Sequence, residues 1–185
     1  MIAIRALDAA EAAARVPALA GLLVDAVAHG ASVSFMAGFA DAEAGAFWRA
    51  QLPEIATGGR RLLVAEDAGR LAGCVVLTFA PQPNAPHRGE VTKMLVHSAQ
   101  RRRGIGRALL GAAEAAARAA GRTLLLLDTE AGSAGEALYR ACGWCWVGAI
   151  PDHALRPDGT PAATSVFYKV VGGGGTGGGS AGSPG

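Results

Sequence analysis

The residues best suited to bind an anion form a short basic segment with two glycines, Arg101-Arg102-Arg103-Gly104-Ile105-Gly106. It lies between an expected strand and an expected helix. Glycine lets a ligand approach the backbone closely, and the first turn of a helix offers unpaired N–H groups and the positive end of its dipole. The arginines add charge and paired donors. The segment therefore predicts a phosphate site, best matched to a pyrophosphate; the alternative is a basic helix start without a ligand.

Two better-known phosphate loops do not fit this segment. A Walker loop would need G-x-x-x-x-G-K-[ST], and a Rossmann fingerprint would need a third glycine after the first strand of a βαβ unit. The chain carries 17 Lys and Arg against 15 Asp and Glu, a net charge of +2, which gives no broad polyanion footprint. We expect no nucleic acid among its partners.

Other catalytic motifs are absent or wrongly placed. The C-x-x-C sequence Cys142-Gly143-Trp144-Cys145 follows the end of an expected helix, whereas redox enzymes place it where a helix begins. A zinc site would need a second pair of ligands at suitable spacing, and a hydrolase of the G-x-S-x-G type would need that motif. We expect no metal.

The elements that must position these residues alternate along the chain. Strands are expected at residues 2–7, 61–66, 70–79, 90–97, 123–128, 146–150 and 164–171, and helices at 8–29, 41–55, 104–120 and 135–142. Asp8 and Asp41 are candidate helix caps, and Asp67-Ala68-Gly69 indicates a hairpin turn. Strands mixed with crossover helices predict a mixed α/β sheet in one domain.

Length and composition agree with a single soluble domain. The chain has 185 residues, 51% of them hydrophobic, but no stretch reaches the roughly 20 apolar residues that span a bilayer. The N-terminus has no signal-peptide pattern, and three cysteines form no disulfide framework. We expect a cytoplasmic protein without a membrane partner. Nine of the 27 glycines fall in residues 172–185, which predicts a flexible tail after a domain of residues 1–171.

In this setting the segment R-x-x-G-x-G after the strand EVTKMLV resembles motif A of the GNAT acetyltransferases. Leu127-Asp128-Thr129-Glu130 and the run from Tyr139 to Gly143-Trp144 resemble motif B. Short segments at 32–35, 47–48, 87–91 and 128–130 are also similar to the tabtoxin-resistance branch, whose members acetylate small amino compounds. The resemblance implies a mixed, mostly antiparallel sheet with a splayed parallel strand pair, flanked by helices.

The resemblance also implies how acetyl-CoA binds, as a co-substrate between strands 90–97 and 123–128. Its pantetheine would pair with the first strand and its pyrophosphate with N–H groups of residues 102–107. The cofactor-binding residues expected are Met94, Leu95, Val96, Arg101, Arg102, Arg103, Gly104, Ile105, Gly106, Arg107 and Ser133. A β-branched residue at either glycine is expected to block the pyrophosphate with little loss of fold.

The implied reaction is attack of an amine on a thioester. A free alkylamine has a pKa of roughly 10.4 and is largely protonated near pH 7, so a base is needed. Glu90 is the first candidate and Asp128 the second, while Tyr139 matches the family tyrosine that protonates the departing thiolate. The structural alternatives are a solvated Glu90, an Asp128 that caps the following turn, and a Tyr139 that only fills the core.

Aromatic residues on or beside the first two helices are candidates for the acceptor pocket, which these helices wall in the family. We expect Phe35, Trp48 and His87 to contact the substrate, under loops at 81–87 and 152–161. The expected activity is N-acetylation of a small amino-acid-like or antibiotic-like molecule. Acetylation of a protein α-amine or lysine, and a non-catalytic acyl-CoA sensor, are the alternatives. A homodimer is left open.

Overall fold

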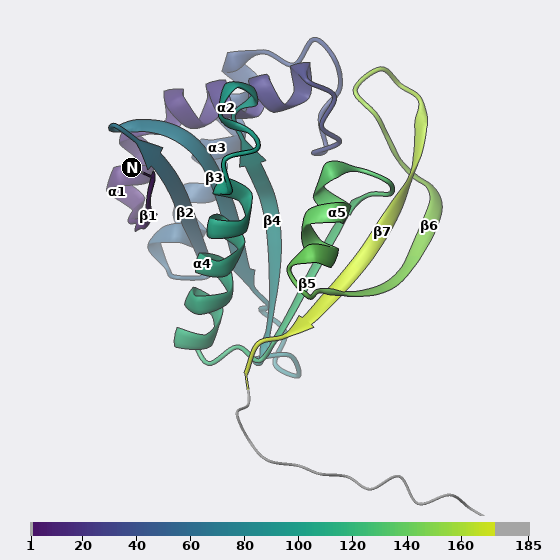
Figure 1. The fold of residues 1–185 in the computed structure, drawn as a ribbon. Coiled ribbons are helices and arrows are strands. Elements are labelled where there is room, and N and C mark those ends of the chain that lie inside the picture. Colours follow the sequence, from purple (N-terminus) through teal and green to yellow (C-terminus); the bar gives the residue numbers. More distant parts are fainter. Residues whose placement is uncertain (1, 173–185) are drawn as a thin grey trace, which may run out of the picture.

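The computed structural model describes residues 2–172, in which seven strands form one sheet in the order β1-β2-β3-β4-β5-β7-β6 (Figure 1). The strands are β1 (Ile2–Leu7), β2 (Arg60–Asp67), β3 (Arg70–Phe79), β4 (Arg88–Val96), β5 (Leu124–Glu130), β6 (Cys145–Leu155) and β7 (Pro161–Val170). Only β4 and β5 pair in parallel; the other neighbours are antiparallel. This confirms the predicted mixed sheet. Apart from Gly172, the predicted tail lies outside the described residues.

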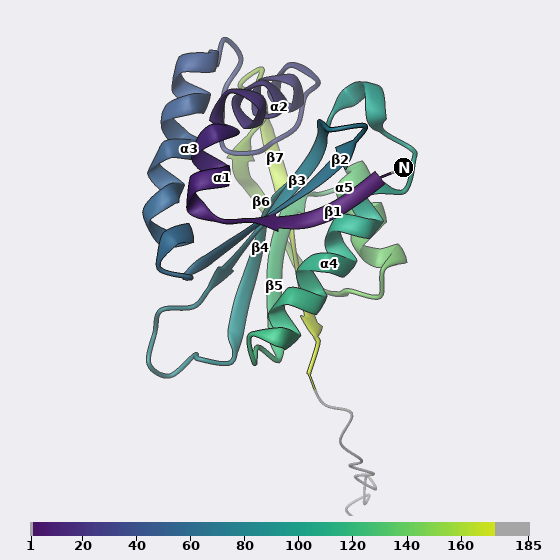
Figure 2. The ribbon, with the colours of Figure 1, turned by 90° about the vertical axis from the view of Figure 1, so that its left-hand side faces the viewer.

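Helices cover both faces of the sheet (Figure 2). One face carries α1 (Ala9–Ala14), α2 (Val16–Ala28) and α3 (Asp41–Ala56), and the other carries α4 (Ile105–Ala119) and α5 (Ala134–Ala141). Each face has its own buried apolar cluster, one beneath α2 and α3 and one beneath α4. No helix within residues 2–172 is long and apolar enough to cross a membrane.

The first helical segment is two helices, and the expected single helix at 8–29 is wrong. The break falls at Arg15, between α1 and α2, with Pro17 in the first turn of α2. Proline has no N–H and its ring clashes with the carbonyl four residues earlier, so a helix cannot run through it undisturbed. The predicted cap Asp8 is confirmed, because its carboxylate accepts the Glu11 N–H at 2.8 Å.

The cap expected at Asp41 is also wrong by one residue. Asp41 is the first residue of α3, and Ala40 holds the cap position. Since alanine has no side-chain acceptor, the start of α3 is secured in the reverse direction. The Ala40 N–H donates to Glu43 Oε2 at 3.1 Å, and the acidic residues of the first turn suit the positive end of the helix dipole.

The hairpin between β2 and β3 agrees with the prediction from sequence, whereas the bounds of β6 and β7 differ from it. Asp67 pairs with Arg70 across a two-residue turn, and Ala68 and Gly69 both have positive φ angles, 49° and 77°, which matches the twist of a tight hairpin. The last two strands are longer than expected. Residues 152–155, expected in a loop, belong to β6.

Along its length, strand β4 changes both its partner strands and the face of the sheet to which its side chains point. It pairs with β5 only where Arg88–Glu90 oppose Leu124–Leu126, and beyond this the two strands separate (Figure 1). Val91 packs beneath α4, whereas Leu95 packs beneath α2 and α3. Residues four apart in a regular strand share a face, so a bulge must lie between them. It is marked by Lys93, whose φ is 48°, and by a register shift between Cys74 and Val76.

Candidate active site

The site expected for acetyl-CoA begins at the open edge of β4. After Glu90, the strand keeps its pairing with β3 on one side and has no partner strand within residues 2–172 on the side of β5. Backbone groups of Met94, Leu95 and Val96 on that edge therefore lie along the opening between the two strands. An extended chain such as a pantetheine can pair with a free strand edge in this way, so the edge fits the predicted ligand.

The helix that follows begins without a side-chain cap. Gly104 is the cap residue of α4, with a φ of 78°, and no side chain accepts a hydrogen bond from the first turn. Arg102 just before it also has a positive φ, 64°. The N–H groups at the start of α4 are thus available to an anion. This arrangement fits the predicted pyrophosphate site.

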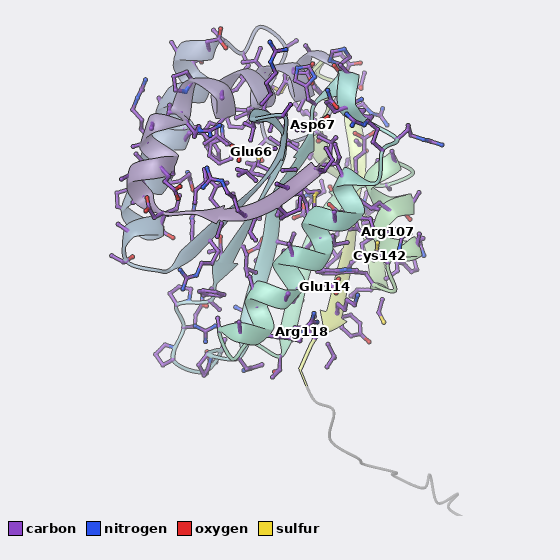
Figure 3. All side chains as sticks on the ribbon, turned by 60° about the vertical axis from the view of Figure 1, so that its left-hand side comes forward. Glu66, Asp67, Arg107, Glu114, Arg118 and Cys142 are labelled. Carbon is purple, nitrogen blue, oxygen red and sulfur yellow. The ribbon has the colours of Figure 1, made fainter. Side chains whose placement is uncertain are left out.

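Most arginine side chains around this helix start have partners within the protein. Arg101 Nε lies 3.4 Å from the Val96 carbonyl, and Arg107 Nη1 donates to the Ala141 carbonyl on α5 at 3.5 Å (Figure 3). Arg103 Nη1 pairs with Asp67 Oδ2 at 2.9 Å. The hydrogen bond from Arg103 holds the pKa of the Asp67 carboxyl below its usual value. The anion site therefore depends more on backbone N–H groups than on these side chains.

Glycine suits positions 104 and 106 for two different structural reasons. A Cβ on Gly104 would meet open space, but the positive φ strains any other residue there. A Cβ on Gly106 would lie 3.0 Å from Leu138 Cδ2 on α5 and 3.9 Å from Val96 Cγ2. A larger residue at Gly106 would therefore press on the end of the Leu138 side chain, which must shift slightly to make room. That such a substitution spares the fold stays a prediction.

Two further cofactor candidates have structural roles. The Ile105 side chain is buried between α4 and the sheet, so only its backbone can reach a ligand. Ser133 is the cap of α5, and its hydroxyl accepts the Glu136 N–H at 3.2 Å. The assignment of Ser133 to the cofactor stays a prediction.

On the opposite side of β4 lies a cavity of about 310 Å³. It is lined by Phe47, Gln51, Arg60, Val76, Thr78, Glu90, Thr92 and Lys93. Arg60 on β2 pairs with Thr78 on β3, which in turn pairs with Glu90 on β4. Directly paired residues point to the same face of a sheet, so these three form a row across the cavity floor. Phe47 and Gln51, one turn apart on α3, form its wall.

The two candidate bases lie on this same face. Glu90 is opposite Leu126 on β5, and Asp128 follows two residues later in the strand, where side chains return to the same side. Both carboxylates are exposed. Asp128 lies close enough to act electrostatically on both Lys93 and Tyr139. The charge of Asp128 thus reaches Lys93 on β4 and Tyr139 on α5.

Tyr139 is largely buried on α5, with 6% of its surface exposed. Its ring centroid lies 6.1 Å from those of Trp144 and Phe167. Burial, and then the Asp128 charge, raise the pKa of the Tyr139 hydroxyl above its usual value. The hydroxyl keeps its proton at neutral pH, and the raised pKa makes it a weaker acid than an exposed tyrosine.

Lys93 is a residue that the sequence reading missed. Its ammonium donates to the Val33 carbonyl at 3.1 Å and lies 3.4 Å from Ser34 Oγ, in the loop between α2 and α3. It also lies over the Phe35 and Phe47 rings, 5.6 and 5.4 Å from their centroids. Burial lowers the pKa of Lys93, and the charge of Asp128 partly opposes this. A lysine inside the apolar strand EVTKMLV was the signal that could have found it.

The two neighbouring aromatic residues of helix α3 lie in different surroundings. Phe47 lines the cavity, whereas Trp48 is 1% exposed and donates from Nε1 to the Leu19 carbonyl at 2.9 Å. The substrate-binding role expected for Trp48 is therefore wrong. Consecutive helical residues point about 100° apart, and the packing of α3 on α2 turns the indole into the core.

The other two acceptor candidates have different outcomes. Phe35 stacks on Phe39 at 4.1 Å and meets Phe47 edge-on at 5.3 Å, so it supports Phe47 from behind without lining the cavity itself. His87 is exposed, does not line the cavity, and uses its carbonyl to accept the Thr123 N–H at 2.8 Å. Its expected contact with substrate is not supported, because it precedes β4 at the end where β5 begins.

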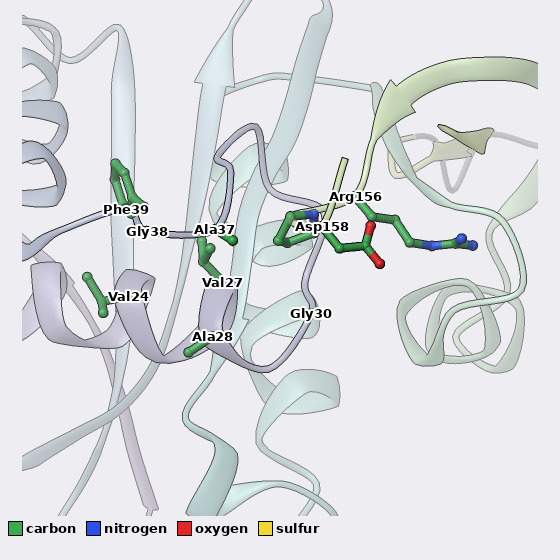
Figure 4. Close-up of a pocket in the computed structure, with 10 residues that line it drawn as sticks. Val24, Val27, Ala28, Gly30, Ala37, Gly38, Phe39, Arg156 and Asp158 are labelled. Atoms are coloured by element: carbon green, nitrogen blue, oxygen red, sulfur yellow. The ribbon is translucent and has the colours of Figure 1, made fainter. Parts of the chain in front are cut away.

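A larger cavity of about 350 Å³ lies between the end of α2 and the β6–β7 hairpin (Figure 4). The Pro157 carbonyl in that hairpin accepts the Ala37 N–H at 2.8 Å, which joins the hairpin to the loop after α2. Arg156 at its rim already pairs with Glu130 at 2.7 Å. None of the candidate catalytic residues lines this cavity, whereas Glu90 lines the smaller one.

Comparison with known proteins identifies the fold and the chemistry. Residues 24–144 match the model of the acetyltransferase (GNAT) family. The chain belongs to this family. It is an acetyl-CoA-dependent N-acetyltransferase, as the resemblance implied, and its fold is that of GNAT enzymes.

Similar solved structures cover nearly the whole chain. An N-acetyltransferase from Staphylococcus aureus Mu50 has a TM-score of 0.76 at 17% identity, covering 93% of this chain and 99% of the other. A ribosomal-protein-alanine N-acetyltransferase from Brucella melitensis has a TM-score of 0.75 at 28% identity, covering 91% and 99%. The structure of yncA from Salmonella typhimurium, which contains its cofactor acetyl-CoA, has a TM-score of 0.74 at 20% identity, covering 92% and 94%. The tabtoxin-resistance branch stays a prediction.

Proposed function

We propose that this acetyltransferase acetylates the amine of a small amino-acid-like or antibiotic-like molecule. The cavity at Glu90 carries the proposal: its volume of about 310 Å³ is at the small end of ligand pockets, which span roughly 300–1,000 Å³. It is walled on one side by α3, through Phe47 and Gln51. Such a pocket suits a compact acceptor.

Glu90 is proposed as the general base. Acetyl-CoA supplies a thioester carbonyl, and an N–C bond forms there as the C–S bond breaks. Glu90 takes a proton from the attacking amine, and the Tyr139 hydroxyl gives one to the departing thiolate. Glu90 lines the acceptor cavity and Asp128 does not, which favours Glu90. Asp128 is the second candidate, because its charge acts on Tyr139, the proposed proton donor.

The proposed domain comprises residues 1–171. One continuous sheet joins β1 to β7 and brings residues of β2, β3 and β4 to the acceptor cavity. Strands from both ends of this range are thus parts of one body, which supports a single catalytic unit.

A second candidate is acetylation of a protein α-amine. The relative at 28% identity is named a ribosomal-protein-alanine N-acetyltransferase, and this favours a peptide acceptor. A peptide would need an open groove beside the catalytic residues, whereas the cavity at Glu90 is small. We therefore rank this activity second.

A thiol-release screen separates the two candidates. Purified protein and acetyl-CoA are incubated with free amino acids, aminoglycosides, polyamines and short peptides with an N-terminal alanine. Release without an acceptor is subtracted. We expect turnover with free small amines and little with peptides. Turnover with peptides alone would overturn the proposed function and favour the second candidate.

A further inference from the structure

Arg60 places a positive charge on the floor of the acceptor cavity. It lies two strands from Glu90, in the row that Thr78 completes. Neighbouring strands are about 4.8 Å apart, so the two Cα atoms are separated by roughly 10 Å. A guanidinium and a carboxylate thus face one small cavity from opposite sides, which is the arrangement that complements a zwitterion.

The donors of Arg60 are incompletely used by the protein. Its Nε lies 2.8 Å from Glu54 Oε2, but it is buried and forms no hydrogen bond within residues 2–172. The Arg60 side chain is 26% exposed and that of Glu54 is 54% exposed. Within residues 2–172, Glu54 is the one ionic partner of Arg60, and it contacts the guanidinium at Nε. A half-buried guanidinium with free donors is matched to a bidentate carboxylate.

The other cation at the cavity is already engaged. Lys93 donates to the Val33 carbonyl and lies over two aromatic rings, so its ammonium is already bound to the loop between α2 and α3. Arg60 is thus the cation best placed to bind a ligand, and it offers two parallel donors where lysine offers a point charge.

We propose that the acceptor carries a carboxylate, which Arg60 binds while its amine faces Glu90. The inference rests on the proposed function and adds to it a substrate class, amino acids in place of simple amines. Arg60 is then a specificity-determining residue. Removing a charge-assisted pair of this kind is expected to cost roughly 10- to 100-fold in kcat/KM for acceptors with a carboxylate.

The test uses acceptors that differ only in the carboxylate. L-Phenylalanine is compared with 2-phenylethylamine, L-methionine with 3-(methylthio)propylamine, and 4-aminobutyrate with propylamine, each in the thiol-release assay. We expect the wild-type protein to favour the carboxylate member of at least one pair by 10-fold or more. Arg60→Gln should abolish this preference by raising KM for that member alone, and Arg60→Lys should retain part of it. The KM for acetyl-CoA should stay unchanged.

Arg61→Gln is the matched control. Arg61 is the next residue of β2 and is exposed on the opposite face, where it pairs with Leu77, so the preference should survive. Equal turnover of both members by the wild type would overturn the inference and leave the proposed function standing. So would an equal loss for both members in Arg60→Gln. If only peptides are turned over, the inference and the proposed function are both wrong.

Discussion

The two sides of strand β4 differ in the groups that they present. On the side of α4, the open strand edge and the uncapped helix start offer backbone groups, and the nearby arginines mostly bind other parts of the protein. On the side of α3, the cavity offers side chains from three strands and a helix, among them Glu90 and Arg60.

This contrast explains why a family motif identifies the cofactor side of β4, whereas no motif identifies the residues on the side of the cavity. Backbone N–H groups recognise a phosphate whatever the surrounding side chains are, provided that the chain turns correctly. An acceptor site made of side chains changes with each residue on its walls. Substitutions that keep the backbone should therefore act mainly on the acceptor side, and substitutions that strain it should act mainly on the cofactor side.

The largest effect is expected from the proposed base. Glu90→Gln keeps the shape of the side chain and removes its charge, so kcat/KM for the acceptor should fall by about 10²- to 10⁴-fold near neutral pH. The loss should shrink at high pH, where free amine is abundant. A pH–rate profile measures this, with Asp128→Asn as the comparison. If both variants retain the full acidic limb, neither carboxylate is the base.

The next largest effect is expected from the two aromatic residues of α3, one in the protein core and one in the wall of the cavity. Trp48→Ala should lower the free energy of unfolding by about 3–5 kcal/mol, the usual cost of removing a buried indole. Phe47→Ala should cost less stability, because Phe47 borders a cavity, and should raise the acceptor KM severalfold. Urea unfolding and steady-state kinetics on both variants decide it. The reverse pattern would place Trp48 in the pocket.

A smaller effect is expected on the cofactor side. Gly104→Val forces a β-branched residue into a positive φ, at a cost of roughly 1–3 kcal/mol, and should weaken acetyl-CoA binding by about 10-fold. Arg102→Ala, which leaves the backbone unchanged, should weaken it much less. Calorimetry measures both affinities. An unchanged affinity in folded Gly104→Val, or a larger loss in Arg102→Ala, would contradict the backbone site.

The smallest effect concerns Lys93, the partly buried cation at the candidate acceptor cavity. Burial lowers the pKa of Lys93 in the folded protein, so the unfolded chain binds more protons between that value and roughly 10.4. The free energy of unfolding should therefore rise with pH across this interval, relative to that of Lys93→Met. Urea unfolding of both proteins from pH 7 to 10 checks this. Parallel curves would show that Lys93 titrates normally.

Features that depend on neighbouring residues were readable from the sequence. The glycine-containing start of α4, the hairpin at Ala68 and Gly69, and the Asp8 cap are each decided within a few residues. Glycine alone tolerates some backbone angles, and a cap contacts N–H groups only two or three positions away. The break at Pro17 belongs to the same class and was missed although its cause is local.

Only the tertiary structure decided which side chains meet. Arg60, Thr78 and Glu90 lie in one row because of the register of three strands. Lys93 reaches the loop after α2 from a position in β4 where a bulge shifts the alternation of side chains. The packing of α3 places Phe47 at the cavity and Trp48 in the core. The sequence alone determined the family and the turns, because those are local. Register, bulges and helix rotation depend on contacts between distant segments, and these determined the acceptor site.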